Sequence, residues 1–482
     1  MERAIQAITL KFILPKPCLC RRSVIFAVQS KCGIYFILNI MNVLKFGGTS
    51  VATAAAMQQV RSIIERESGA VVVLSACGGV TNRLLEAVRV AGTGQSEAAV
   101  MIVREVEERH VQLCGELFTA GDLQRDAVSK VKILCMELRV FCEGVALLGE
   151  CTPRSYDAAA SYGERLSTLI FSLYCQSVGL NARLFDAREI MRTDSVFMEA
   201  SIHFPTLQAL AKEKLLPLLE RGELIITQGF IGADERGVTT TLGRGGSDLS
   251  AALMGAAIGA SEILIYTDVS GVASADPRMI PSARPIPVMS FTEARELSFY
   301  GAKVLHPETI LPAVERGIPV RVLNTFAPGD AGTLIVGRRD AERAGLSAVT
   351  LKKDCNMLRV QGVNSAHQLA GLYHLLAEIT GEVYATLSGE SVCTVIFSAP
   401  KLGRELLLAH CSGWKIDVES CTLLCAVGAR IDGATVAEFT AAVGKFEPWA
   451  VVSGSSDGCL LAVLPPASAV AALQAVHDGI AC

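Results

Sequence analysis

The chain has 482 residues, about half of them apolar, and its formal net charge is −4. This length predicts two to four domains with substantial cores. The nearly balanced charge argues against a nucleic-acid-binding surface, and the sequence has no apolar run long enough to predict a membrane span. The 16 cysteines are scattered without paired Cys-x-x-Cys motifs, which is typical of buried thiols in a reducing compartment.

Residues 1–40 differ from the rest of the chain, because they contain six basic residues and only one acidic residue. A basic, acid-poor leader is typical of a transit peptide. The alternative is that Met41, which lies just before the first predicted strand, is the true start of the protein. We therefore expect a cytoplasmic protein, or a plastid protein if the leader is a genuine transit peptide.

The first motif is a short apolar run, residues 43–46, followed by Gly-Gly-Thr-Ser and a helical pattern over 51–67. Glycines let backbone N–H groups approach an anion, and Lys45 adds a full positive charge at the end of the predicted strand. The motif therefore predicts a phosphate-binding turn. The alternative is a plain strand-to-helix turn whose hydroxyl residues only cap the helix.

A second apolar strand is predicted over 70–74, and the Gly-rich turn after it carries Ser75 and Thr81. In an open α/β sheet, ligands bind at the carboxyl ends of the strands, although both residues could simply cap the next helix. Residues 97–149 have apolar residues at helical spacing, which predicts helices that cover the sheet.

Ser161 and Glu164 match a capping box at the start of a helix predicted to end near Tyr174. In that interpretation, the carboxylate of Glu164 only bonds a backbone N–H. The alternative is that this carboxylate is presented to a cationic group, such as the ammonium of a substrate.

The most informative loop is Gly-Arg-Gly-Gly-Ser-Asp at residues 243–248, which leads into a small-residue helix predicted over 249–260. The guanidinium of Arg244 matches a carboxylate bidentately, which a lysine cannot do. Asp248 lies at the helix start, where the alternative is an N-cap.

A strand predicted over 262–266 ends in Thr267 and Asp268, and the long loop that follows reaches Arg278. Such a loop at the carboxyl end of a strand suits the base and ribose of a nucleotide. A helix is predicted over 290–300, a second candidate lysine follows at Lys303, and 319–323 is predicted as the last strand of this domain.

The last third contains an internal repeat after a predicted linker at residues 329–345. The order strand, helix, strand, strand, helix is predicted twice, each time over roughly 65 residues. We expect the two units at 346–420 and 421–482.

Seven strings in order carry a resemblance to the aspartate kinases of the amino-acid kinase superfamily. They are Lys-Phe-Gly-Gly-Thr-Ser, Gly-Val-Thr-Asn, Ser-Tyr-Gly-Glu-Arg-Leu-Ser, Gly-Arg-Gly-Gly-Ser-Asp, Thr-Asp-Val, Asp-Pro-Arg and Gly-Ala-Lys-Val-Leu-His. The resemblance covers nearly all of residues 41–482. It implies an α/β fold with an open, mainly parallel sheet between helices over 41–328, followed by two α+β ferredoxin-like ACT modules.

The resemblance also implies the roles of individual residues. The residues that fall to ATP are Lys45, Phe46, Gly47, Gly48, Thr49, Ser50, Thr267, Asp268, Arg278, Lys303 and Val304. Those that fall to L-aspartate and its surroundings are Ser75, Thr81, Glu164, Arg244 and Asp248. Lys45, Arg244, Asp248 and Lys303 are the expected catalytic residues, and no protein ligand to a metal is expected. The family often has Tyr where this chain has Ala273, so an aromatic contact near the nucleotide is in doubt.

The chemistry of carboxylate phosphorylation agrees with these residue types. The attacking carboxylate is already ionised at pH 7, so no general base is required. The reaction needs ATP, Mg²⁺ and cations placed around the transferring phosphoryl group. The resemblance further implies a homodimer or higher homo-oligomer through the ACT modules, with lysine or threonine as a candidate effector; whether the modules also regulate or only dimerise is left open.

Overall fold

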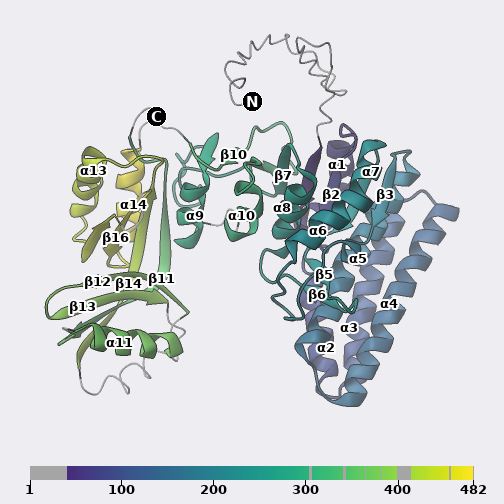
Figure 1. Ribbon diagram of the computed structural model, residues 1–482, viewed down its shortest axis with the longest axis horizontal. Coiled ribbons are helices and arrows are strands. Elements are labelled where there is room, and N and C mark those ends of the chain that lie inside the picture. Colours follow the sequence, from purple (N-terminus) through teal and green to yellow (C-terminus); the bar gives the residue numbers. More distant parts are fainter. Residues whose placement is uncertain are drawn as a thin grey trace, which may run out of the picture.

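The computed structural model describes residues 41–302, 305, 307–339, 344–363, 365–379, 381–398, 414–454 and 458–480. Lys303, Val304 and the leader lie outside this part of the chain, so the predictions about them, including the cytoplasmic or plastid location, stay predictions. Figure 1 shows two bodies, which we call the first unit (residues 41–336) and the second unit (residues 344–480).

The first unit is organised around an eight-stranded sheet of order β3-β4-β2-β1-β7-β9-β10-β8. Its strands are parallel except for the antiparallel pair of β9 and β10. Residues of the central strand β2 are all buried, as expected for a parallel strand covered on both faces. The strands are β1 (Asn42–Phe46), β2 (Val71–Leu74), β3 (Ala182–Phe185), β4 (Leu224–Gln228), β7 (Glu262–Thr267), β8 (Val288–Ser290), β9 (Val320–Asn324) and β10 (Thr333–Val336). The mainly parallel α/β sheet is thus confirmed.

Helices cover both faces of this sheet, because alternate residues of each strand point to opposite sides. Val71 and Val73 pack in one core, whereas Val72 and Leu74 pack in the other. One layer consists of α1 (Ala54–Ile64), α2 (Val80–Ala91), α3 (Ser96–Leu117), α4 (Asp122–Leu148) and α5 (Pro153–Ser177). The other consists of α6 (Phe204–Leu210), α7 (Leu216–Glu220), α8 (Gly246–Ile258), α9 (Phe291–Phe299) and α10 (Leu311–Val314). Figure 1 shows α3 and α4 side by side as a long hairpin.

Three local predictions were wrong. Helix α5 begins at Pro153 rather than at Ser161, because Thr152 provides its N-cap. The capping box is therefore absent, and the hydroxyl of Ser161 instead donates to the carbonyl of Ala158. The predicted linker contains β10, so 319–323 is not the last strand of the sheet. The helix after Ser50 is interrupted: a 3₁₀ turn, η1 (Gly48–Val51), precedes α1.

The second unit is built on a six-stranded antiparallel sheet of order β12-β13-β11-β14-β16-β15. Its elements are β11 (Ala348–Gln361), α11 (Ala366–Ile379), β12 (Glu382–Ser388), β13 (Val392–Ser398), β14 (Lys415–Val427), α13 (Gly433–Gly444), β15 (Ala450–Ser453), β16 (Cys459–Leu464) and α14 (Ala469–Asp478). Strand, helix, strand and strand occur twice in this order, which confirms the repeat. The helix predicted over 401–411 lies outside the described residues.

Strand β11 contributes to the cores of both repeats. Leu358 and Val360, in its second half, pack with α11 and β13 in one core. Val349 and Leu351, in its first half, pack with α13 and α14 in the other core. The two repeats therefore share a strand as well as a sheet.

The second unit also packs directly on the loop that follows β7. Ala275 and Ile280 of this loop are buried in the core that contains α14. The side chain of Ser274 lies 2.9 Å from Nε2 of His477 on α14, and its carbonyl accepts the N–H of Val349 at 2.8 Å. The loop predicted for the nucleotide is therefore anchored to the second unit.

Two further observations bear on the composition-based predictions. Within the described ranges, every cysteine is a free thiol, and all except Cys151 are buried. In the same ranges, the structure contains no helix whose length and apolar character would let it cross a bilayer.

Candidate active site

A cavity of about 400 Å³ opens at the carboxyl ends of β1 and β2. It is lined by Lys45, Gly48, Ser75, Ala76, Cys77, Gly78, Gly79, Thr81, Asn82, Glu164, Phe230, Gly243, Gly245, Gly246, Ser247 and Asp248. Six residues predicted for the site line this cavity, although they come from four separate regions of the sequence. They are Lys45, Gly48, Ser75, Thr81, Glu164 and Asp248.

Lys45 and Asp248 form an ion pair across the cavity, with 2.7 Å between Nζ and Oδ1. Their side chains are only 11% and 17% exposed, so water screens this pair weakly. Lys45 stands on β1 between β2 and β7, whereas Asp248 lies in the first turn of α8, which follows Gly245 in a left-handed conformation. Asp248 therefore fixes the position of the ammonium group of Lys45.

The two glycine-rich turns lie against each other at the floor of the cavity. A Cβ atom on Gly48 would lie 2.8 Å from the carbonyl oxygen of Ala76, closer than real Cβ contacts allow. The N–H of Gly78 donates to the carbonyl of Gly48 at 2.9 Å. Only glycine fits at position 48. Because glycine has no side chain, a ligand in the cavity beside Lys45 can approach the backbone of this turn.

Glu164 lies in the middle of α5 and is only 3% exposed. Its Oε1 accepts the N–H of Ala76 at 3.1 Å, and within the described residues its buried Oε2 has no hydrogen-bond partner. Burial raises the pKa of this carboxyl to about 8, although the Ala76 N–H and the charge of Lys45 lower it. A cationic group entering the cavity would find an acceptor here and would favour the ionised carboxylate.

Sequence reasoning missed several residues of the site. Asp157 is buried on α5 and accepts hydrogen bonds from the N–H of Met198 and from both the N–H and the hydroxyl of Thr241. These bonds fix the position of Thr241, the residue directly before the loop at 242–248. Ser247, which also lines the cavity, accepts the hydroxyl of Ser75 at 3.0 Å. No local pattern marks Asp157, because its partners lie far away in the sequence.

Cys77 also lines the cavity, but its environment does not favour a nucleophilic role. Its thiol donates to the carbonyl of Val51. Burial raises the pKa of this thiol to about 12, so it stays protonated at neutral pH.

Arg244 is exposed and is not among the residues that line the cavity. The pKa of Glu382 on β12 is lowered by the hydrogen bond from Tyr384, and the charges of Lys352 and Arg244 lower it further. The guanidinium therefore lies close enough to the second unit to interact with it. Arg244 thus does not line the cavity in this conformation, although its neighbours Gly243 and Gly245 do, and its predicted contact with the substrate stays a prediction.

The residues predicted for ATP divide into buried and exposed groups. Phe46 stacks on Tyr266 in the core, with 4.7 Å between ring centroids, and the hydroxyl of Ser50 bonds that of Thr325 at 2.7 Å. Both side chains therefore support the fold directly. Gly47 and Thr49 belong to the turn but do not line the cavity.

The nucleotide candidates Thr267, Asp268 and Arg278 do not line the cavity. The hydroxyl of Thr267 donates to its neighbour Asp268, and Arg278 is exposed and paired with Asp276 at 2.6 Å. Asp268 and Arg278 lie in the loop between β7 and β8, and Thr267 is the last residue of β7. Their predicted contacts with a nucleotide stay predictions.

Comparison with known proteins agrees with this geometry. The model of the Amino acid kinase family matches residues 41–324. The lysine-sensitive aspartokinase 3 of Escherichia coli K12 is 32% identical over 453 residues, which cover 91% of this chain and 98% of that protein. The chloroplastic aspartokinase 1 of Arabidopsis thaliana is 37% identical over 374 residues, which cover 76% of this chain and 65% of the plant protein.

Solved structures show the same relationship. Aspartokinase III of E. coli in complex with lysine and aspartate (T-state) superimposes with a TM-score of 0.79 at 30% identity. The same enzyme in complex with aspartate and ADP (R-state) superimposes with a TM-score of 0.73 at 31% identity. Each match covers 91% of this chain and 99% of the other. From the family match, the identity over nearly the whole E. coli protein and the shared fold, this chain belongs to the amino acid kinase family and, within it, to the aspartokinases.

Proposed function

We propose that this protein transfers the γ-phosphoryl group of ATP to the β-carboxylate of L-aspartate. The products are ADP and 4-phospho-L-aspartate, and the reaction is the first step toward lysine, threonine and methionine. The observation that carries the proposal is the convergence of Lys45, Glu164 and Asp248 on one cavity. The E. coli relative has been crystallised with aspartate and ADP, which supports the same substrate pair.

The residues of the cavity suit this reaction. A β-carboxylate is ionised at pH 7, so one of its oxygens can attack the γ-phosphorus without a general base. A new P–O bond forms to this oxygen while the bond to the leaving ADP breaks. The ammonium of Lys45 neutralises charge on the transferring group, and Asp248 keeps that ammonium in place.

Glu164 is proposed to receive the ammonium group of the substrate. Its buried Oε2 is available within the cavity, and the hydrogen bond from Ala76 holds Oε1. The carboxyl would lose its proton when the cation binds, because an opposite charge at close range favours the ionised form. Glu164 would therefore carry its negative charge only while the ammonium group of the substrate is bound.

Arg244 is proposed to bind a carboxylate of the substrate after the loop at 243–246 rearranges. Gly243 and Gly245 flank Arg244, and both adopt left-handed backbone conformations. Such glycines can change backbone angles at low cost, so the guanidinium could turn from Glu382 toward the cavity. Thr267, Asp268, Arg278 and Lys303 are proposed to contact ATP.

Mg²⁺ is proposed to accompany ATP. In the described ranges, no three His, Cys, Asp or Glu side chains form a cluster that could hold a metal ion. Mg²⁺ bound together with ATP would be coordinated largely by phosphate oxygens. When bound, it neutralises charge on the β- and γ-phosphates.

The second unit is proposed to bind an amino-acid effector and to join subunits into a dimer or larger oligomer. The E. coli relative is named as lysine-sensitive and has been crystallised with lysine. Lysine is therefore the first candidate effector, with threonine as the alternative. The hydrogen bond between Ser274 and His477 connects this unit to the loop predicted for the nucleotide, so a movement of α14 on effector binding would displace that loop.

The test is an assay with MgATP and L-aspartate in which hydroxylamine traps the acyl phosphate. Acetylglutamate serves as control substrate, and lysine and threonine are added in turn. Lys45→Ala should lower the rate by on the order of 10²-fold or more, with an unchanged circular dichroism spectrum. Lys130→Ala, at an exposed lysine paired with Asp126, is the matched control. Near-normal turnover by Lys45→Ala would remove Lys45 from the mechanism, and phosphorylation of acetylglutamate alone would replace the proposed substrate.

A further inference from the structure

Helix α4 has apolar residues on two opposite faces. One face, with Val131, Leu138 and Val145, is buried in the core of the first unit. The opposite face carries what we call the α4 stripe, which consists of Ile133, Met136, Val140 and Leu147. These side chains are 48%, 51%, 63% and 90% exposed, respectively. Their spacing by three, four and seven residues places them on one line along the helix.

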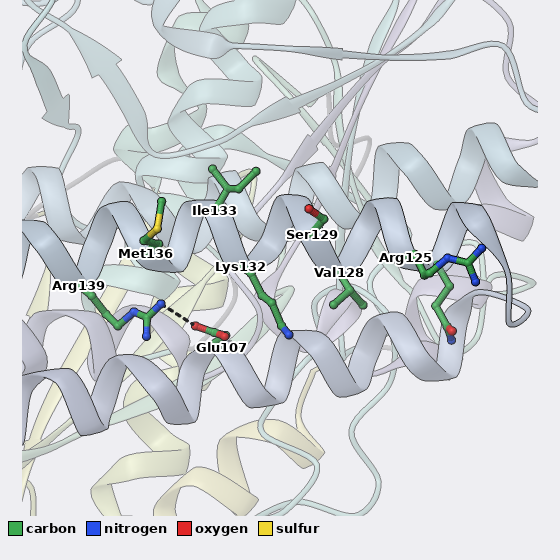
Figure 2. A pocket seen from close by; sticks show the side chains of 9 residues that line it. Glu107, Arg125, Val128, Ser129, Lys132, Ile133, Met136 and Arg139 are labelled. Atoms are coloured by element: carbon green, nitrogen blue, oxygen red, sulfur yellow. Dashed lines mark ion pairs between the residues drawn. The ribbon is translucent and has the colours of Figure 1, made fainter.

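The stripe borders a groove of about 600 Å³ between α3 and α4. Figure 2 shows Ile133 and Met136 on the side of α4 that points away from Glu107, whereas Arg139 turns toward it. Arg139 and Glu107 form an ion pair at 3.8 Å, so these two charges on the groove side are paired with each other. The stripe has no comparable cover among the described residues.

Charged residues along the stripe indicate which partner fits it. Lys132 and Glu143 are eleven residues apart, which is about three helical turns, so both lie on the same side of the stripe. Both are exposed, and neither forms an ion pair within the described part of the chain. An unpaired cation and an unpaired anion thus flank the stripe at its two ends, on the side of α4 that faces the groove, where Figure 2 shows Lys132.

We propose that the α4 stripe is an interface between two copies of this chain, in which the two α4 helices pack antiparallel. A two-fold axis between residues 137 and 138 places Lys132 of each copy opposite Glu143 of the other, so the pair forms twice. The same alignment brings Met136 within one residue of the level of Val140, and the small Ser129 within one residue of the level of Leu147. A parallel arrangement would instead bring like charges together, which disfavours it.

This interface is separate from association through the second unit. Figure 1 shows α4 at the edge of the first unit, on the far side from the six-stranded sheet. Both contacts can therefore form at the same time, and a chain that uses both would assemble beyond a dimer. The inference depends on the shape and charge of α4 and is independent of the proposed reaction.

The test compares the mass of the full chain and its variants by light scattering after size-exclusion chromatography, over a range of concentrations. Met136→Glu combined with Val140→Glu should halve the mass of the assembly at concentrations where the wild type is fully associated. Leu123→Glu is the matched control, because Leu123 is 60% exposed on the same helix but lies outside the stripe. All of these side chains are exposed, so helical content by circular dichroism should be unchanged.

A charge exchange tests the antiparallel alignment. Lys132→Glu and Glu143→Lys should each weaken association at least tenfold, since each places like charges opposite one another, and the double variant should restore it. The proposal is overturned if the stripe variant has the wild-type mass, which would mean that α4 faces solvent or another partner. It is equally overturned if the double variant associates no better than the single ones.

Discussion

The buried carboxyl of Glu164 leads to a quantitative prediction about stability and pH. Its pKa is about 8 in the folded protein, against 4.5 for an ordinary glutamate. The folded state therefore holds this proton more tightly than the unfolded chain does. The contribution of Glu164 to the free energy of unfolding is thus largest below pH 4.5 and falls as the pH rises toward 8.

The size of the effect follows from the two pKa values. Between pH 6 and pH 8, Glu164 is almost fully ionised in the unfolded chain, whereas in the folded protein it stays mostly protonated until the pH approaches 8. This group alone should then lower the free energy of unfolding by about 2 kcal/mol over that interval. Glu164→Gln has nearly the same shape as the neutral acid and cannot ionise, so it should abolish this part of the pH dependence.

The measurement is urea unfolding of the wild type and of Glu164→Gln, each at pH 6 and pH 8. Other titrating groups are common to both proteins, so the difference between their pH dependences isolates Glu164. At pH 6 the two proteins should be similarly stable, and at pH 8 the variant should be the more stable. An equal fall in stability for both proteins would refute the assignment of a raised pKa to Glu164.

The same carboxyl links substrate binding to protons. If Glu164 receives the ammonium of L-aspartate, binding near pH 7 should release close to one proton from this site, about 0.9 by the same pKa. Calorimetry in two buffers of different ionisation enthalpy measures this release. Glu164→Gln should bind L-aspartate more weakly and without the release, and an unchanged release would exclude Glu164 as its source.

Three further variants test the supports of the site. Asp157→Asn should lower the free energy of unfolding by about 1–3 kcal/mol, because the new amide NH₂ group cannot accept a hydrogen bond and one buried donor therefore loses its acceptor. Urea titration measures this loss. Gly48→Ala should cost about 1–3 kcal/mol by steric overlap with the backbone and should also depress turnover, as unfolding and hydroxylamine assays would show. His477→Ala removes the bond to Ser274, so KM for ATP should rise while KM for aspartate stays nearly constant; equal changes in both would place the effect outside the nucleotide loop.

The parts of the fold that could be predicted from sequence depend on local patterns. The apolar runs of β1 and β2 predicted buried strands, which the structure contains at the expected residues, and the glycine-rich turns after them line one cavity; ligand binding by these turns stays a prediction. The family resemblance implied that Lys45 and Asp248 serve one active site, and the structure joins the two side chains in an ion pair.

The parts that could not be predicted depend on contacts between distant segments. A Ser-x-x-Glu spacing is the same at the start of a helix and in its middle, so the role of Glu164 became visible only through its bond to Ala76. Strand β10 is a run of only four residues, Thr-Leu-Ile-Val, and the Gly- and Arg-rich residues on both sides of it predicted a linker instead; its pairing with β8 and β9 brings it into the sheet. Arg244 lies close enough to Glu382 of the second unit for its charge to lower the pKa of that carboxyl, an interaction between distant segments that no local pattern reports.

The continuity of β11 and β14 through both repeats has a consequence for how such a chain can gain or lose a module. The first repeat begins near Cys355 on β11 and ends near Cys421 on β14, and these two residues are paired in the sheet. The neighbouring pair, Lys352 with Leu423, already belongs to the other repeat. The intervening residues are therefore an insertion whose two ends meet in an antiparallel ladder. A short hairpin turn could close that gap, leaving the remaining repeat, with its contacts to Ser274, in one piece.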